Sequence, residues 1–248
     1  MLAILDGFGQ SGGVSDRAPL RARDIARAAL VAEITETARR HLAESGAAAL
    51  SLRAVSRELG MASSAIYRYF PSRDALLTRL IVDAYDALGA AVEAAEAAIE
   101  RGDLAGRFAA IAHGVRSWAR ANPHEYALIY GSPVPGYAAP EDTIVPAARV
   151  TMRLLGLLAD LDDRDLPVAE PAPPNLAPEL VEQLSGLVAQ AGLTIEPYRM
   201  LVGVGAWTEL YGMVSFELFG QFRNVFDDAD ALFAARVEAM AARMGVGS

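Results

Sequence analysis

The sequence predicts an all-α protein, in which a long helix joins a three-helix unit near the N-terminus to a larger helical domain. Three observations support this fold class. Apolar residues recur at spacings of three and four along most of the chain, as they do on one face of an α-helix. No segment shows the alternation of apolar and polar residues that is typical of a strand. Prolines gather between the periodic segments, and five of the 13 lie within 162–178.

The chain begins with a segment of different composition. Residues 1–19 are rich in glycine, serine and aspartate, which predicts a disordered tail. A domain of residues 20–80 is expected to follow. Its first helix should begin in the low twenties and end at Ser45.

A short helix is expected next, over residues 52–59. Ser51 is a suitable N-cap for it, because a serine hydroxyl can accept a bond from an amide of the first turn. Leu52 and Val55 lie three residues apart and therefore share a face. Gly60 ends the helix, since glycine readily adopts the left-handed backbone of a helix C-terminus.

A second short helix should begin at Ser63 or Ser64 and continue to Phe70. Pro71 cannot extend this helix because it lacks a backbone N–H. Ser72 is the expected N-cap of the following helix. Two short helices separated by a glycine turn form the layout of a helix-turn-helix unit, whose second helix enters the major groove of DNA.

The helix that begins at Arg73 is expected to extend past Ile99 and to end near Gly102. It would join the first domain to a helical domain of residues 81–248. Further helical patterns cover 104–121, 124–130, 143–161, 178–191, 196–223 and 228–244.

The segment 200–222 is strongly apolar, since Glu209 and Glu217 are its only charged residues. A helix that is apolar on more than one side is buried on more than one side. A second copy of the chain is the simplest partner for the additional side, which would make a homodimer. A central core helix of a monomer is the alternative.

Charge is distributed unevenly along the 248 residues, whose net charge is −9. Residues 17–80 hold 11 arginines and six acidic residues, whereas residues 81–248 hold 11 arginines and 23 acidic residues. The chain contains no lysine. A net positive charge is thus confined to the segment with the helix-turn-helix pattern, as the binding of phosphate requires. Ordinary variation in charge is the alternative.

Composition argues against several other classes of protein. The chain has no cysteine and only three scattered histidines, so we expect no disulfide, no metal site and no cofactor. No apolar run approaches the roughly 20 residues of a membrane span. The first residues lack the basic region of a signal peptide. We therefore expect a cytoplasmic protein with no membrane partner.

The first domain resembles the DNA-binding domain of the tetracycline-repressor-like (TetR) family. The resemblance covers Ile34 to Leu80. It rests on residues whose types and spacing match the family pattern, namely Ile34, Ala38, Leu42, Gly46, Ser51, Gly60, Tyr67, Arg68, Tyr69, Phe70, Ser72, Arg73 and Asp74. Arg73 stands where the family usually has lysine, and it keeps the positive charge.

The resemblance implies a transcriptional regulator that binds a palindromic operator in double-stranded DNA. The candidates for contact with base edges are Ser63, Ser64, Ala65 and Arg68. The candidates for contact with phosphate are Arg53, Tyr67, Tyr69 and Arg73, together with the helix N-termini at Ser51 and Ser72. Packing is the alternative role for Tyr69 and the preferred role for Phe70.

The second domain resembles a TetR subgroup named for a Trp-His-Gly signature. Trp207, Tyr211 and Gly212 match its spacing, with tyrosine in place of the histidine. The family resemblance implies that this domain dimerises and encloses a pocket for a small-molecule effector. The candidate lining residues are Phe108, His113, Trp118, Tyr126, Met152, Trp207, Glu209 and Tyr211. For each aromatic residue, ordinary core packing is the alternative.

The expected function is repression of transcription that a small apolar or amphipathic ligand relieves. Activation, or regulation without a ligand, would use the same fold. A helical small-molecule-binding protein without DNA activity is an alternative from another class. An enzyme is not expected and no catalytic residue is assigned, because the sequence has no glycine-rich phosphate loop, metal-ligand spacing or nucleophile elbow.

Overall fold

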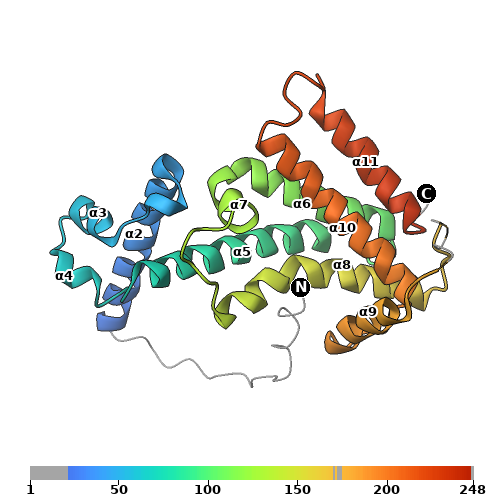
Figure 1. Cartoon of the computed structure of the whole chain (residues 1–248), viewed down its shortest axis with the longest axis horizontal. Helices are drawn as coiled ribbons and strands as arrows, with labels where there is room; N and C mark the ends of the chain where they lie inside the picture. The colour runs from blue at the N-terminus through green and yellow to red at the C-terminus, as the bar shows by residue number, and fades with distance from the viewer. Residues whose placement is uncertain (1–21, 170, 172–174, 247–248) are drawn as a thin grey trace. The chain divides into compact units, whose positions relative to one another are not determined.

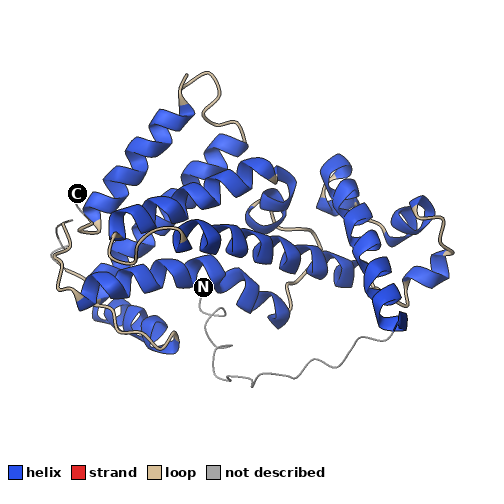
Figure 2. Ribbon diagram, turned by 180° about the vertical axis from the view of Figure 1, so that it is seen from behind, coloured by secondary structure: helices blue, strands red, loops and turns tan. Residues whose placement is uncertain are grey.

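The computed structural model describes residues 22–169, 171 and 175–246. Every regular element in those ranges is a helix, which confirms the all-α prediction (Figures 1 and 2). The predicted disordered tail, residues 1–19, lies outside the described residues.

The helices follow the expected order closely. In the first part of the chain they are α2 (Ala22–Ser45), η1 (Ala47–Ala49), α3 (Leu52–Glu58), α4 (Ser63–Ile66) and α5 (Arg73–Ala97). The remainder are α6 (Leu104–Ala121), α7 (Pro123–Tyr130), η2 (Glu141–Thr143), α8 (Ile144–Asp163), α9 (Pro178–Gln190), α10 (Pro197–Leu218) and α11 (Ala229–Arg243).

Three helices are shorter than predicted. The helix α5 was expected to extend past Ile99 but ends at Ala97, because the Ile99 amide bonds to the Glu96 carbonyl three residues earlier and tightens the chain into a turn. The helix α4 ends at Ile66 instead of Phe70, because the amides of Arg68 and Tyr69 each bond to the carbonyl three residues earlier and tighten the chain into turns. The helix α10 ends at Leu218, two residues before Gly220 adopts a φ of 80°. That left-handed glycine ends the helix earlier than its apolar pattern does.

The predicted capping residues differ in what their side chains do. The Ser72 hydroxyl accepts a bond of 3.0 Å from the Ala75 amide, so it caps α5 as predicted. Ser51 occupies the N-cap position of α3 with extended backbone, but its side chain makes no capping bond. Ala62, and neither Ser63 nor Ser64, is the N-cap of α4.

The chain folds as two compact units, and α5 contributes residues to both. The first unit contains the helix-turn-helix elements up to Tyr85 together with 122–143. The second contains 86–121 and the described residues from 144 onward. Our sequence analysis placed the whole of 122–143 in the second domain, because α7 gives no local sign of where it packs.

Three polar contacts hold 122–143 within the first unit. The Tyr85 hydroxyl donates to the Ile129 carbonyl at 3.3 Å. The hydroxyls of Thr78 and Tyr137 lie 2.9 Å apart. Arg39 on α2 forms an ion pair of 3.2 Å with Glu125 on α7. The first unit is therefore larger than a three-helix reader.

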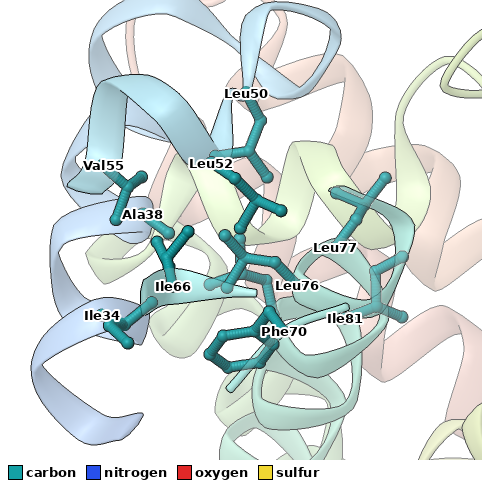
Figure 3. Packing of buried hydrophobic residues seen from close by; sticks show 11 residues of the cluster. Ile34, Ala38, Leu50, Leu52, Val55, Ile66, Phe70, Leu76, Leu77 and Ile81 are labelled. Carbon is teal, nitrogen blue, oxygen red and sulfur yellow. The ribbon is translucent and has the colours of Figure 1, made fainter. Parts of the chain in front are cut away.

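The core of the first unit lies where α2, α3, α4 and the start of α5 meet (Figure 3). Ile34, Val55 and Ile66 have no exposed surface, and Phe70 is also buried. The packing role preferred for Phe70 is thus confirmed. Gly60 has a φ of 63°, so the turn between α3 and α4 uses the left-handed backbone that glycine allows.

The second unit is a bundle in which α10 packs against α6, α8, α9 and α11. Its largest fully buried side chains include Phe108, Leu157, Leu210 and Phe233. Buried arginines tie the helices together. Arg107 on α6 donates to Glu96 on α5, and Arg116 on α6 donates to Glu217 on α10.

Candidate nucleic-acid interface

The α3–turn–α4 segment buries one face and presents the other to solvent. Leu52, Val55 and Ile66 point into the core of the first unit (Figure 3). On the opposite side, Ser63 and Ser64 are exposed, as are Tyr67 and Arg68 in the turn that follows α4. The buried residues therefore hold a surface of small and polar side chains facing outward, which is what a reader of the major groove needs.

Four exposed arginines of this unit have no acidic or carbonyl partner within the described part of the chain, namely Arg23, Arg53, Arg57 and Arg68. Arg53 and Arg57 are four residues apart on α3 and therefore share a face. Most arginines of the second unit, by contrast, bind carboxylates or carbonyls. Cations that are not neutralised within the protein are the groups available to DNA phosphates.

Sequence reasoning missed one of these residues, Arg57. The spacing of four between Arg53 and Arg57 was a visible signal that both lie on one face of α3. The absence of an acidic partner was not visible, because some acids of this unit, such as Glu58, reach an arginine only through the tertiary fold.

Glu58 illustrates that effect at the end of α3. Arg40 of α2 donates to one of its oxygens at 2.8 Å, and Nε2 of His41 lies 2.6 Å from the other. These hydrogen bonds, chiefly that from Arg40, lower the pKa of Glu58 below its ordinary value. The carboxylate is thus ionised and paired, so its charge opposes an approaching phosphate less than a free carboxylate would.

The predicted phosphate contacts fall into two groups. Arg53 and Tyr67 are exposed, and Tyr67 shows 45% of its surface. Tyr69 is half-buried beneath the guanidinium of Arg27, which lies 5.1 Å from the centre of its ring. Arg73 is half-buried and directs its guanidinium toward backbone carbonyls.

The remaining predicted contacts lie within the short helix α4 or at the starts of α3 and α5. Ala65, a predicted base-edge contact, is half-buried, whereas its neighbours Ser63 and Ser64 are exposed. Ser51 is half-buried at the start of α3, and Ser72 is exposed at the start of α5. The structure thus brings the predicted residues together on one unit, with Arg73 the member that differs most from expectation.

Comparison with known families agrees with this geometry. The family model described as bacterial regulatory proteins, tetR family, matches residues 34–80, and the model of the tetracyclin repressor-like C-terminal domain matches residues 108–240. The chain belongs to the TetR family. It is therefore a helix-turn-helix transcriptional regulator, as the resemblance in its sequence implied.

Individual relatives of this TetR-family chain extend over most of its length. It is 38% identical over 226 residues to the HTH-type transcriptional regulator Rv1816 of Mycobacterium tuberculosis, covering 88% of this chain and 93% of the relative. HTH-type transcriptional regulator Mb1846 of Mycobacterium bovis matches with the same identity and coverage. The crystal structure of SCO4313 superposes with a TM-score of 0.72 at 33% identity, covering 90% of this chain and all of that one.

No two of the eight predicted pocket residues of the TetR effector domain line the same one of the cavities described below. Tyr126 is buried in the first unit, where its ring lies 5.1 Å from that of Tyr130. Phe108 is 1% exposed and belongs to the core of the second unit, whereas His113 is exposed on the surface of α6. Trp118 and Tyr211 are buried.

The other three candidates line three separate cavities of the second unit. Glu209 lines a cavity of about 290 Å³ between α10 and α11. Trp207 lines a narrow apolar cavity of about 30 Å³ between α8 and α10. Met152 lines a cavity of about 300 Å³ with the ionic cluster around Arg107. The first and third approach the lower end of the sizes typical of small-molecule sites.

Glu209 is held by two arginines of α11. Arg236 donates through Nε at 2.8 Å, and Arg243 also donates to this carboxylate. Burial disfavours the charged form of Glu209, but the bonds from Arg243 and Arg236 outweigh burial and lower its pKa. Glu209 is thus an ionised part of a structural cluster at the edge of the cavity.

No group of three or more histidine, cysteine, aspartate or glutamate side chains in the described ranges is arranged to hold a metal ion. None of the helices described is both long enough and apolar enough to cross a bilayer.

Proposed function

We propose that this regulator is a homodimeric repressor that binds a palindromic operator and leaves it when a small apolar or amphipathic ligand binds the second unit. The observation that carries the DNA-binding part is the exposed face of α3 and α4, where Arg53, Arg57 and Arg68 lack acidic partners among the described residues. The protein would act in the cytoplasm, where the operator is. Activation of transcription is distinguished from repression by the position of the operator relative to the promoter.

In this proposal, α4 and the turn after it enter the major groove. Ser63, Ser64 and Arg68 would contact base edges, because they are exposed on the side opposite the core. Arg53 and Arg57 on α3 would contact the phosphate backbone. Two copies related by a two-fold axis would read half-sites separated by about 34 Å, one turn of DNA, or a multiple of it.

The first prediction tests this assignment on the DNA upstream of the protein's own gene. Replacing Arg68 by alanine should cost about 1–3 kcal/mol in binding and relax the preference for one base pair in each half-site, because an arginine in the groove reads a base edge. Footprinting would define the operator, and titrations with single-base variants of it would measure the preference.

Arg79→Ala is the matched control. Arg79 is an exposed arginine of the same unit, but it is paired with Asp83 at 2.8 Å on the same helix. Its loss should leave binding within about 0.5 kcal/mol of the wild type. Uniform weakening by Arg68→Ala on every sequence would assign Arg68 to phosphate. No protection of any site by the wild-type protein would contradict the function as a whole.

The dimer is proposed to form through α10 and α11. Small residues are exposed along both helices, among them Gly205 and Thr208 on α10 and Ala231 and Ala235 on α11. Phe216, which lies on α10 as well, is 53% exposed. Small side chains allow close approach of helices, and an exposed apolar side chain gains by burial against a partner. These properties support a helical interface between two copies.

The second prediction uses a glycine of this face. A Cβ atom at Gly205, which also borders the cavity between α10 and α11, would meet no atom within 4 Å, so a side chain can begin there without displacing the backbone of one copy. Gly205→Arg should nevertheless convert the dimer to a monomer in sedimentation velocity, because a long charged side chain would enter the interface. Gly186→Arg on α9 is the control, since a Cβ there also meets nothing within 4 Å and the residue is exposed. A Gly205→Arg protein that remains dimeric would place the interface elsewhere.

The effector part of the proposal relies on the cavities of the second unit. The cavity between α10 and α11 combines apolar walls, such as Leu201 and Met240, with the ionised Glu209. Such a lining suits a small amphipathic molecule. Since α5 contributes residues to both units, it is the proposed element through which a ligand changes DNA binding. If operator affinity were the same with and without each small molecule tested, the protein would regulate without an effector.

A further inference from the structure

Arg73 is the first residue of α5, and its guanidinium reaches back to the connection between α2 and α3. Nε donates to the Leu50 carbonyl at 3.2 Å. Nη2 donates to the carbonyls of Ala47 at 2.9 Å and Ala48 at 3.4 Å. Three carbonyls within four consecutive residues therefore share one side chain that is 23 to 26 positions away in the sequence.

The connection that receives these bonds is otherwise held by short-range backbone bonds, from the Ala49 amide to the Gly46 carbonyl at 3.2 Å and from the Leu50 amide to the Ala47 carbonyl at 3.3 Å. The helix η1 is three residues long, and no side chain caps its start. Gly46 before it takes a φ of 75°, and Leu50 after it leaves helical geometry. Carbonyls near a helix end lack partners within the helix, and the Arg73 guanidinium supplies donors to those of Ala48 and Leu50 and a second donor to that of Ala47.

The same connection sets where α3 begins. Leu50 is 4% exposed and belongs to the core cluster, where Figure 3 shows it beside Leu52. The carbonyl of the next residue, Ser51, accepts the amides of Ala54 and Val55 and so starts the first turn of α3. A bond that fixes the Leu50 peptide therefore fixes the base of the helix that carries Arg53 and Arg57.

We propose that Arg73 is a positioning residue of the DNA reader, which holds the α2–α3 connection to α5, and that it is not a phosphate contact. The proposal rests on the proposed function in so far as it concerns DNA. Arginine suits this role because its planar guanidinium donates several N–H groups in fixed directions, whereas a lysine ammonium is a compact point charge. Lysine, which the family resemblance leads one to expect here, would keep the charge but could not donate to the three carbonyls in the same fixed directions.

Arg73→Lys separates the two roles because it preserves the charge. If Arg73 positions α3, the lysine variant should lower the melting temperature by about 2–4 °C. It should also weaken operator binding about tenfold, on all operator variants alike, without changing the slope of log affinity against log salt concentration. A phosphate contact would instead be largely rescued by lysine. The measurements are thermal unfolding monitored by circular dichroism and DNA titration at four or more salt concentrations.

Arg53→Gln is the comparison variant, since Arg53 is exposed and has no acidic partner among the described residues. Its loss should reduce the salt slope by about 0.9, the value for one phosphate contact, and leave the melting temperature unchanged. Arg73→Gln should show the opposite pattern, with a lower melting temperature and an unaltered slope. An Arg73→Lys protein equal to the wild type in melting temperature and affinity would overturn the proposal.

Amide hydrogen exchange tests Arg73 independently of DNA. In Arg73→Lys, faster exchange confined to residues 46–55 is expected, because local opening of the connection would become easier. Unchanged exchange there would contradict the positioning role even if the protein binds its operator. Conversely, failure of the wild-type protein to bind DNA would refute the proposed function, while the exchange and melting data would still decide whether Arg73 holds the connection.

Discussion

Replacing Arg107 by methionine is expected to lower the free energy of unfolding by about 3–5 kcal/mol. The side chain of Arg107 is 8% exposed, and that of its partner Glu96 is 1% exposed. Arg107 donates to Glu96 through Nε at 2.9 Å and Nη2 at 2.8 Å, and it also donates to Asp160. Methionine fills a similar space but removes the buried donor that Glu96 and Asp160 share, so that Glu96 keeps only the partly exposed Arg153 and Asp160 keeps only the exposed Arg101 among the described residues. Chemical denaturation would measure the change.

Arg101→Ala is the control for this prediction. Arg101 donates to the same Asp160 carboxylate at 2.9 Å, but its side chain is 84% exposed. Solvent screens an exposed pair, so the expected loss is under about 1 kcal/mol. Similar losses from both substitutions would show that burial does not determine the strength of this cluster.

The pH dependence of the Arg107 variant follows from Asp160. Burial disfavours the charged form of this group, but the bonds from Arg107 and Arg101 outweigh burial and lower its pKa. A lowered pKa in the folded state contributes stability above the ordinary pKa of aspartate, and this stability is lost as the pH falls through the folded value. The difference between wild type and Arg107→Met should therefore be largest near neutral pH and shrink below about pH 4. A constant difference down to pH 3 would contradict the ionic origin of the effect.

Replacing Phe108 by alanine is expected to cost about 3–5 kcal/mol of stability, the typical effect of removing a buried aromatic ring. Phe108 is 1% exposed on α6 and is among the largest fully buried side chains. This result would assign it to the core, whereas a residue that lines an effector pocket would tolerate truncation better, because the pocket already contains space. Thermal and denaturant unfolding would measure the loss.

His113 on the same helix provides the comparison. It was also a predicted pocket residue, but it is exposed, and its ring meets Phe233 edge-on with 5.2 Å between centroids. His113→Ala should change stability by less than about 1 kcal/mol. If Phe108→Ala were as mild as His113→Ala, the core assignment would be wrong and a pocket beside α6 would become the better interpretation.

The helices and the family could be predicted because their signals are local. The spacing of Leu52 and Val55 and the left-handed glycine at Gly60 depend on residues a few positions apart. The aromatic run and Ser72-Arg73-Asp74 pattern lie within the same short segment. The end of α4 was less predictable, because whether the last turn before a proline is helical or tightened depends on small differences in packing.

In the candidate sites too, residues with local sequence signals could be predicted, whereas residues whose role depends on packing could not. The sequence indicated which residues surround the helix-turn-helix, and the structure places them all on one unit. The pocket candidates were less predictable, since apolar spacing makes Phe108 and Trp207 look alike. Only the packing of α6, α8 and α10 separates the first, which is core, from the second, which borders a cavity.

The sequence by itself determined the all-α class, the order of the helices and the helix-turn-helix identity of the first unit, because short-range spacing and capping encode them. Only the tertiary structure decided which arginines are available to DNA. Arg68 and Arg73 are five residues apart and chemically identical, yet Arg68 is exposed and the Arg73 guanidinium donates to carbonyls of the α2–α3 connection. Hydrogen bonds between residues more than 20 positions apart depend on how the helices pack, and no local pattern reveals them.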